Sequence, residues 1–210
     1  MGRKSLKDVR SKEIIEAFYK LAKKEGLENA SMAKTAEIID MNPSLIVHYF
    51  KTKEYLVYGL IEFILDKYLL IFSVPAAIKN DPEQTLLKVI DNIFSDKWNK
   101  LFDDSVSYSC YALTFRDEVI KEKYKNLLDT LRQRLVDLIV QCNKAGKISV
   151  KDPVMAADMI FVLVDGAYYY LSLVKNKQEY KQKIARYKEQ ALEHLQFATS
   201  PSSRSGRSKK

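Results

Sequence analysis

The sequence of 210 residues is poor in the residue types on which catalytic, metal and phosphate-loop sites depend. Its two histidines, His48 and His194, lie far apart along the chain. There is no Gly-rich phosphate loop, no zinc-spaced cluster and no Gly-x-Ser-x-Gly motif. We therefore expect a protein that is not an enzyme, with no catalytic residues, no metal site and no cofactor.

Cysteine is also scarce, because the chain has only Cys110 and Cys142. Two cysteines are too few for a disulfide scaffold, and Cys142 shares an apolar helical stripe with Leu135, Leu138 and Ile139. The N-terminus is basic and then amphipathic, without the apolar core segment of a signal peptide. These features predict a cytoplasmic protein in which Cys142 is an inert core thiol.

Long stretches of alternating apolar and polar residues are absent, and glycine and proline are few. The hydrophobic content of 47% is enough for a substantial core. The chain is therefore predicted to be all-α, with about nine helices. Besides two short helices within residues 31–50, the expected helices span residues 7–25, 53–72, 82–102, 106–115, 117–145, 153–174 and 178–197.

The net charge of +8 is concentrated at the two ends of the chain. Residues 1–60 carry a net charge of +3 and residues 199–210 carry +4, whereas the residues between them are close to neutral. A basic N-terminal region suits phosphate binding. Its first charges form either an arm that follows DNA or a frayed terminus, and they are Arg3, Lys4, Lys7 and Arg10. The tail at 199–210 has no apolar anchor and is predicted to be disordered.

Residues 31–56 contain the most informative pattern. Ser31 can cap a first short helix, in which Met32, Ala36 and Ile39 form one apolar stripe. Asn42 can cap a second short helix, with Pro43 at its first position. The spacing predicts two short helices joined by a tight turn.

The second short helix has an outward face whose side chains are not explained by packing against the core. At about 100° per residue, Ile46 and Phe50 face the core. Ser44, Leu45 and His48 then point away from the core, and Val47 and Tyr49 flank them. Two helices with this exposed second face are typical of a helix-turn-helix that enters the major groove of DNA.

A third helix is predicted to begin at Thr52, as its cap, with Lys53 in its first turn. A positive charge there is unfavourable for the helix dipole, and a DNA phosphate bound by Lys53 and the free N–H groups would resolve this. Alternatively, Lys53 is solvated and Glu54 offsets its charge.

Residues 10–56 resemble the N-terminal domain of the tetracycline-repressor (TetR) family of bacterial transcription regulators. The resemblance is carried by Gly26 after the first helix, Ser31, the segment 36–39, Asn42, and the run His48-Tyr49-Phe50 followed by Lys53-Glu54-x-Leu56. Two positions differ from the family. Ile39-Asp40 replaces the usual Ala-Gly turn, and Val47 stands where an aromatic residue commonly precedes the histidine or tyrosine pair. Asp adopts the left-handed turn conformation readily, so we expect the turn to persist.

The resemblance implies an N-terminal helix-turn-helix DNA-binding domain at 1–52, a helical regulatory and dimerisation domain at 53–198, and the basic tail at 199–210. We expect Ser44, Leu45 and His48 to touch base edges. The backbone would be positioned by Ser31, Lys34, Thr35, Tyr49 and Lys53, with Asn42 and Pro43 close to both sets. The helix at 53–72 would connect a sensor to the DNA reader.

The apolar segment at 154–174 is long enough to cross a bilayer, but Asp158 and Asp165 lie inside it at a high energetic cost in a membrane. We expect no membrane partner and a helix buried in a core or between subunits. Gly166 and Ala167 would allow close approach of another helix. The resemblance implies a homodimer through the helices around 153–174 and 178–197, and a monomeric core is the alternative.

Aromatic residues are frequent in the middle of the chain. Most aromatic residues at helical spacing belong to a core, but buried tyrosines need hydrogen-bond partners and favour a semi-polar cavity. The candidate ligand-binding residues are Trp98, Tyr108, Tyr111 and Tyr168. Asp165 either forms a structural salt bridge, which we favour, or pairs with a cationic ligand.

Together these features predict a transcriptional regulator, more often a repressor, released from a palindromic operator by a small, largely apolar or aromatic effector. The alternative is a ligand-independent helix-turn-helix regulator or a protein-interaction module.

Overall fold

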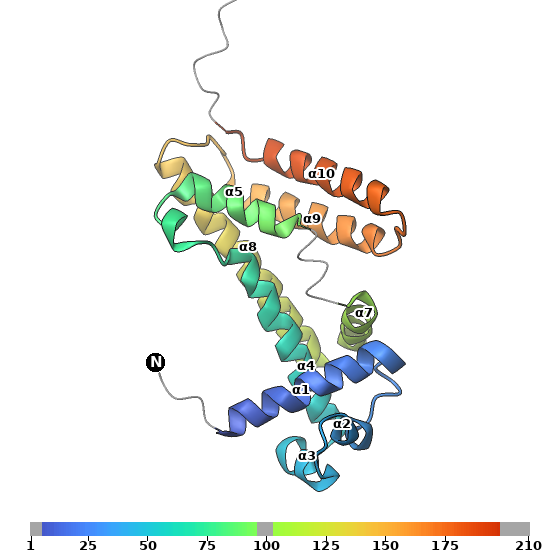
Figure 1. The fold of residues 1–210 in the computed structure, drawn as a ribbon. Coiled ribbons are helices and arrows are strands. Elements are labelled where there is room, and N and C mark those ends of the chain that lie inside the picture. Colours follow the sequence, from blue (N-terminus) through green and yellow to red (C-terminus); the bar gives the residue numbers. More distant parts are fainter. Residues whose placement is uncertain (1–5, 96–102, 198–210) are drawn as a thin grey trace, which may run out of the picture. The chain divides into compact units, whose positions relative to one another are not determined.

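A computed structural model describes residues 6–95 and 103–197 (Figure 1). Within these ranges the chain forms nine α-helices and three 3-10 helices, and its only β pairing is an isolated bridge between Ile148 and Phe197. The all-α prediction is confirmed. The α-helices are α1 Leu6–Glu25, α2 Met32–Ile38, α3 Pro43–Phe50, α4 Lys53–Tyr68, α5 Pro82–Ile93, α7 Asp104–Ala112, α8 Glu118–Lys144, α9 Pro153–Leu171 and α10 Lys177–Glu193. The 3-10 helices are η1 Leu69–Phe72, η2 Ala76–Ile78 and η3 Leu113–Phe115.

The chain divides into two compact units. Unit 1 spans Met1–Ile71 and Asp96–Leu128, and unit 2 spans Phe72–Ser95 and Asp129–Lys210, each considered over its described residues. Unit 1 holds the three N-terminal helices, α4, α7 and the start of α8. Unit 2 holds α5, the rest of α8, α9 and α10, with α9 and α10 side by side (Figure 1).

Helix boundaries follow the local chemistry of the sequence. The side chains of Ser31 and Asn42 accept hydrogen bonds from the first turns of α2 and α3, as their positions predicted, and Asp152 accepts one from the first turn of α9. Gly26 ends α1 with φ +87°, a conformation that suits glycine. Thr52 stands at the N-cap position of α4, as predicted, but its side chain makes no capping hydrogen bond.

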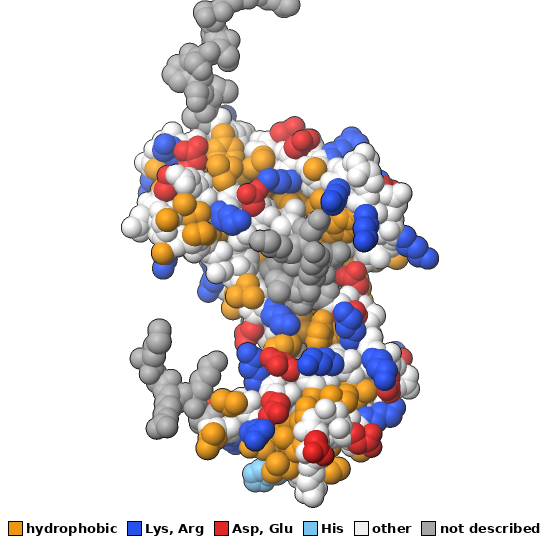
Figure 2. All heavy atoms as spheres, viewed as in Figure 1, with side chains coloured by type: hydrophobic (Ala, Val, Ile, Leu, Met, Phe, Trp, Pro, Cys, Tyr) orange, Lys and Arg blue, Asp and Glu red, His pale blue; other side chains and the backbone are white. Residues whose placement is uncertain are grey.

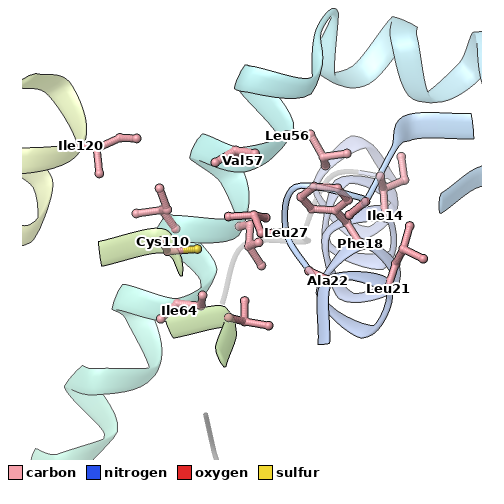
Figure 3. Close-up of a cluster of buried hydrophobic side chains, with 14 of the residues drawn as sticks. Ile14, Phe18, Leu21, Ala22, Leu27, Leu56, Val57, Ile64, Cys110 and Ile120 are labelled. Atoms are coloured by element: carbon pink, nitrogen blue, oxygen red, sulfur yellow. The ribbon is translucent and has the colours of Figure 1, made fainter. Parts of the chain in front are cut away.

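The core of unit 1 joins α1 to α4 and α7. Phe18 of α1, Leu56 and Ile64 of α4 and Ile120 of α8 are all buried (Figure 3). Cys110 of α7 lies among these apolar side chains, and burial raises the pKa of its thiol to about 12. Helix α4, which follows α3, is therefore held by apolar contacts along most of its length.

The core of unit 2 is formed by α5, α8, α9 and α10. Its buried side chains include Leu86, Ile90, Leu135, Ile160 and Ile184. Cys142 is fully buried on α8, and burial raises the pKa of its thiol to about 11, as expected of an unreactive core cysteine.

Candidate nucleic-acid interface

The turn between α2 and α3 sets the direction of α3 relative to α2. Asp40 adopts φ +48°, the left-handed conformation expected for an aspartate at this position. The backbone N–H of Met41 donates to the Ala36 carbonyl at 2.9 Å and closes the turn. Asn42 Oδ1 then accepts from the Ser44 N–H at 3.0 Å, and Pro43 starts α3.

Helix α3 presents one face to the core and the other to solvent. Ile46 is fully buried and Phe50 is half-buried against the core of unit 1. Ser44, Leu45 and His48 are exposed, and so are Asn42, Pro43 and Val47. Figure 2 shows hydrophobic side chains and a histidine exposed at the α2–α3 end of unit 1. The outward arrangement predicted for this helix is present.

Tyr49 lies at the edge of this face. Its ring meets that of His48 edge-on, with centroids 5.7 Å apart, while part of the side chain packs against the unit 1 core. Arg10 of α1 is close enough to interact electrostatically with Tyr49, and its guanidinium also pairs with Glu13 at 2.6 Å. One cation from the N-terminal helix is thus positioned near the outward helix, whereas Arg3 and Lys4 lie outside the described residues.

Two lysines, one on α2 and one at the start of α4, are held by the end of α1 and the segment that follows it. Lys34 Nζ lies 2.6 Å from Glu25 Oε2, and Lys53 Nζ donates to the Glu28 carbonyl at 2.9 Å. The hydrogen bond from Lys34 lowers the pKa of the Glu25 carboxyl below its usual range. Both lysines therefore have defined positions, and Lys34 is already partly neutralised.

Thr35 is not on the surface. The residue is fully buried, and its hydroxyl donates to the Ser31 carbonyl at 2.7 Å, so it stabilises the first turn of α2. Ser31 itself accepts from the Lys34 N–H at 3.2 Å and is half-buried. The expectation that Thr35 contacts the DNA backbone is corrected here, because no part of its side chain reaches solvent.

Helix α9 carries an apolar stripe on its exposed side. The α9 stripe consists of Met155, Met159, Val162, Gly166, Tyr169 and, just after the helix, Leu173. These residues recur at alternating intervals of four and three, the spacing of a helix seam. A Cβ added to Gly166 would meet nothing within 4 Å, so space is open at the middle of the stripe.

The two aspartates of α9 pair with one arginine of α8. Arg132 lies 3.3 Å from Asp158 and 3.5 Å from Asp165, and its guanidinium stands over the Phe161 ring. The helix is long and apolar enough, by length and composition, to cross a membrane, and 33% of its apolar window is buried inside the protein. The ion pairs agree with the structural role predicted for Asp165.

The C-terminal part of the chain decides the family. A family model described as "Tetracyclin repressor-like, C-terminal domain" matches residues 81–197, which is more than half of the chain. The chain belongs to the TetR family. TetR-family proteins are DNA-binding transcription regulators and not enzymes. The resemblance predicted from residues 10–56 is thus confirmed by a separate part of the sequence.

Solved structures of TetR-family regulators share this fold. A regulator from Haloarcula marismortui ATCC 43049 matches with a TM-score of 0.77 at 14% identity, over 91% of this chain and 100% of that chain. A TetR-family regulator from Cytophaga hutchinsonii matches with a TM-score of 0.74 at 17% identity, over 91% and 98%. A regulator from Saccharomonospora viridis, solved in complex with choline, matches with a TM-score of 0.70 at 16% identity, over 91% and 100%. A comparison with curated proteins found no match.

The candidate ligand-binding residues of this TetR-family protein are distributed over both units. Tyr108 and Tyr111 belong to unit 1, Tyr168 belongs to unit 2, and Trp98 lies outside the described residues. The Tyr168 hydroxyl donates to the Ile93 carbonyl at 2.6 Å within unit 2.

In unit 1, Tyr111 is part of an aromatic group. Its ring meets the rings of Phe115 and Tyr124 edge-on, with centroids 5.8 Å and 5.6 Å apart. Burial raises the pKa of Tyr124, and Cys110 belongs to the same buried cluster. Sequence periodicity did not reveal Tyr124 as the inner member of this group.

Proposed function

We propose that this TetR-family protein is a homodimeric transcription regulator, more often a repressor, that binds a palindromic operator and is released by a small ligand. The observation that carries the proposal is the outward face of α3, whose side chains are exposed and do not pack against the core. We expect the protein to act in the cytoplasm.

The DNA contacts follow from exposure. Ser44, Leu45 and His48 would touch base edges in the major groove. Phosphates would be bound around this face, mainly by cationic side chains and free N–H groups. The phosphate-binding set is Ser31, Lys34, Tyr49 and Lys53, with Asn42 and Pro43 at the start of α3 close to both kinds of contact.

The α9 stripe supports the dimer. Val162 is 58% exposed and Leu173 is 71% exposed, and both lie on the same side of α9 as the open space at Gly166. A second copy related by a two-fold axis would cover this stripe, with α10 at its edge. Two α3 helices in such a dimer read half-sites one helical turn apart, about 34–36 Å, which makes the operator a palindrome.

The ligand would act through α4. Tyr111 and Tyr124 belong to the same unit as α4, and Cys110 beside them packs into the α4 core. A ligand bound against these aromatic rings would change the tilt of α4 and spoil the half-site spacing. It can do so only if it binds the DNA-free form more tightly.

The ligand class is a small, largely apolar or aromatic compound. One structural neighbour, the regulator from Saccharomonospora viridis, was solved with choline, and quaternary ammonium groups bind on aromatic faces. Choline is therefore a reasonable first compound to test. A ligand-independent regulator, or a module that uses α3 for protein contacts, is the alternative.

The test is binding of the purified full-length protein to the DNA upstream of its own gene and to random DNA across a salt series. We expect specific binding that persists at physiological salt, while nonspecific binding falls steeply. Adding choline and a panel of aromatic compounds to the specific complex would then identify an effector. Binding that is only nonspecific and salt-labile, to this DNA and to a random-sequence pool alike, would contradict the proposal.

A further inference from the structure

The outward face of α3 has an unusual chemical composition for a surface that reads DNA. The eight residues of helix α3, PSLIVHYF, include no lysine, arginine, aspartate, glutamate, asparagine or glutamine. Those are the side chains that read guanine, adenine and cytosine through hydrogen bonds in the major groove. Base recognition by this helix must therefore depend on other contacts.

The polar groups on this face are few. The Ser44 hydroxyl donates to Asn42 Oδ1 at 2.8 Å, so its proton is already engaged inside the protein. The remaining side chain with a ring N–H is His48, whose ring also meets Tyr49. Within α3 itself, one histidine and one engaged serine leave little capacity for discrimination by hydrogen bonding, and the Asn42 amide lies just before the helix.

Apolar surface occupies the positions on either side of them. Leu45 is 42% exposed and Val47 is 49% exposed, although Ile46 between them is fully buried. At 3.6 residues per turn, Leu45 lies roughly 60° from His48 around the helix axis, and Val47 lies roughly 100° away on the other side. Both are too exposed to contribute much to the core, and Leu45 lies closer to the outward direction.

The charges around this face indicate its partner. Lys34 and Lys53 lie in the same small domain, and Lys51 is exposed directly after α3. An apolar face bordered by cations fits a polyanion that carries apolar groups at its centre. The thymine C5-methyl group in the major groove of DNA has this character, and it is contacted by apolar side chains.

We propose that Leu45, and Val47 on the other side of His48, recognise different thymine methyl groups in each half-site, so that the sequence preference of α3 is set largely by apolar contacts. This inference rests on the proposed DNA binding. It adds the base chemistry of the operator, which should contain thymine at the positions that face Leu45 and Val47.

The experiment uses duplexes that the full-length protein retains from a random-sequence pool. Each thymine of a retained duplex is replaced in turn by uracil, which pairs identically but lacks the methyl group. At the thymine that faces Leu45 we expect affinity to fall about fourfold, the effect of one buried methyl group. Leu45→Ala should bind the thymine and uracil duplexes equally at that position, and Val47→Ala should do so at a different thymine.

Two further variants sharpen the test. Leu45→Met keeps an apolar side chain of similar size and should keep the preference for thymine. Val119→Ala removes an equally exposed apolar side chain on α8 and should leave the thymine-to-uracil ratio unchanged.

The inference is overturned if the protein selects a specific sequence but no uracil substitution changes its affinity. It is also overturned if Leu45→Ala and Val47→Ala both keep the full preference for thymine. If the folded protein retains no preferred sequence from the pool, the proposed DNA binding itself fails. The two failures are therefore distinguishable.

Discussion

The Tyr58 hydroxyl donates a 2.6 Å hydrogen bond to Asp117 Oδ2, and this bond joins α4 to the residue that precedes α8. Asp117 Oδ1 also accepts from the Ile120 N–H at 3.1 Å, so one carboxylate both caps α8 and holds α4. One turn along α4, Glu62 pairs with Lys123 of α8. These polar contacts fasten the helix that leads out of the DNA-reading domain.

Replacing Tyr58 by Phe removes the hydroxyl and leaves the ring. We expect the thermal unfolding midpoint at pH 7 to fall by roughly 1–3 °C. The bond from Tyr58 holds the pKa of Asp117 below its usual value of 3.8, so the stabilisation is present at neutral pH. It is lost as pH falls through the folded pKa, and the difference between wild type and variant should shrink below about pH 4.

Tyr55→Phe is the matched control for this experiment. Tyr55 is exposed, and its ring meets that of Tyr58 edge-on. A similar loss of stability in Tyr55→Phe, or a difference between wild type and Tyr58→Phe that does not shrink as the pH falls below 4, would show that the Tyr58–Asp117 bond is not the cause.

Lys53→Ala and His48→Ala separate backbone binding from base reading. We expect Lys53→Ala to weaken binding to every DNA sequence and to reduce the slope of log affinity against log salt by about 1. His48→Ala should instead change the preference among sequences. The measurement is a salt titration on specific and random duplexes.

Lys79→Ala removes an exposed lysine of unit 2 and serves as the control. Its effect on the salt slope should be small. Equal effects of Lys53→Ala and His48→Ala on specific and random DNA would argue against a base-reading role for His48.

Under the proposed DNA binding, Glu25 would compete with a DNA phosphate for Lys34. The carboxylate lies 2.6 Å from the ammonium, so DNA must displace it or accept a partly neutralised lysine. We expect Glu25→Gln to strengthen DNA binding by roughly two- to fivefold at low salt and less at high salt. Glu179→Gln removes a carboxylate of α10 that pairs with Lys183 and controls for the change in net charge. Weaker binding by Glu25→Gln would mean that Glu25 positions Lys34 for DNA.

Val162→Glu places a charge in the middle of the α9 stripe. If two copies pack through this stripe, the buried charge has no partner and the dimer should dissociate at micromolar concentration. Sedimentation or light scattering gives the oligomeric state directly. Val119→Glu, at an exposed apolar position of unit 1, should remain dimeric. A Val162→Glu protein that is still dimeric would rule out the stripe as the interface.

Lys51 adopts φ +54° with ψ −56°, a conformation that residues with a Cβ rarely occupy. Lys51→Gly should relieve this strain and stabilise the protein by about 1 kcal/mol. Asp40 also has a positive φ, but aspartate tolerates it, so Asp40→Gly should gain less. Thermal unfolding of both variants tests the ranking, and a larger gain for Asp40→Gly would contradict it.

The sequence predicted those features that depend on neighbours along the chain. The caps at Ser31 and Asn42, the left-handed Asp40 and the end of α1 at Gly26 each follow from one residue and its local backbone. The burial of Thr35 was also accessible, because Thr35 lies next to Ala36 on the same apolar side of α2 as Met32 and Ile39. Family resemblance placed it on the DNA side, and helical periodicity gave the better indication.

Contacts between side chains of different helices could not be predicted from the sequence in this way. Glu25 holds Lys34, and Asp117 holds Tyr58, through bonds that depend on how separate helices approach one another. Arg132 pairs with two aspartates of α9, but the sequence offers several lysines and arginines on α8 and gives no reason to choose one. Apolar periodicity shows that a helix packs, whereas the identity of its polar partners requires the three-dimensional arrangement.

Folding and recognition use different side chains of α3. Ile46 and Phe50 anchor the helix, whereas the residues that face outward contribute little to the core. Under the proposed DNA binding, exchanges at Ser44, Leu45, Val47 or His48 would therefore change what the helix reads at little risk to its stability. A duplicated copy of this gene could acquire a new operator by a few such exchanges while keeping its scaffold intact. The same independence allows an engineer to redirect the regulator by randomising four positions.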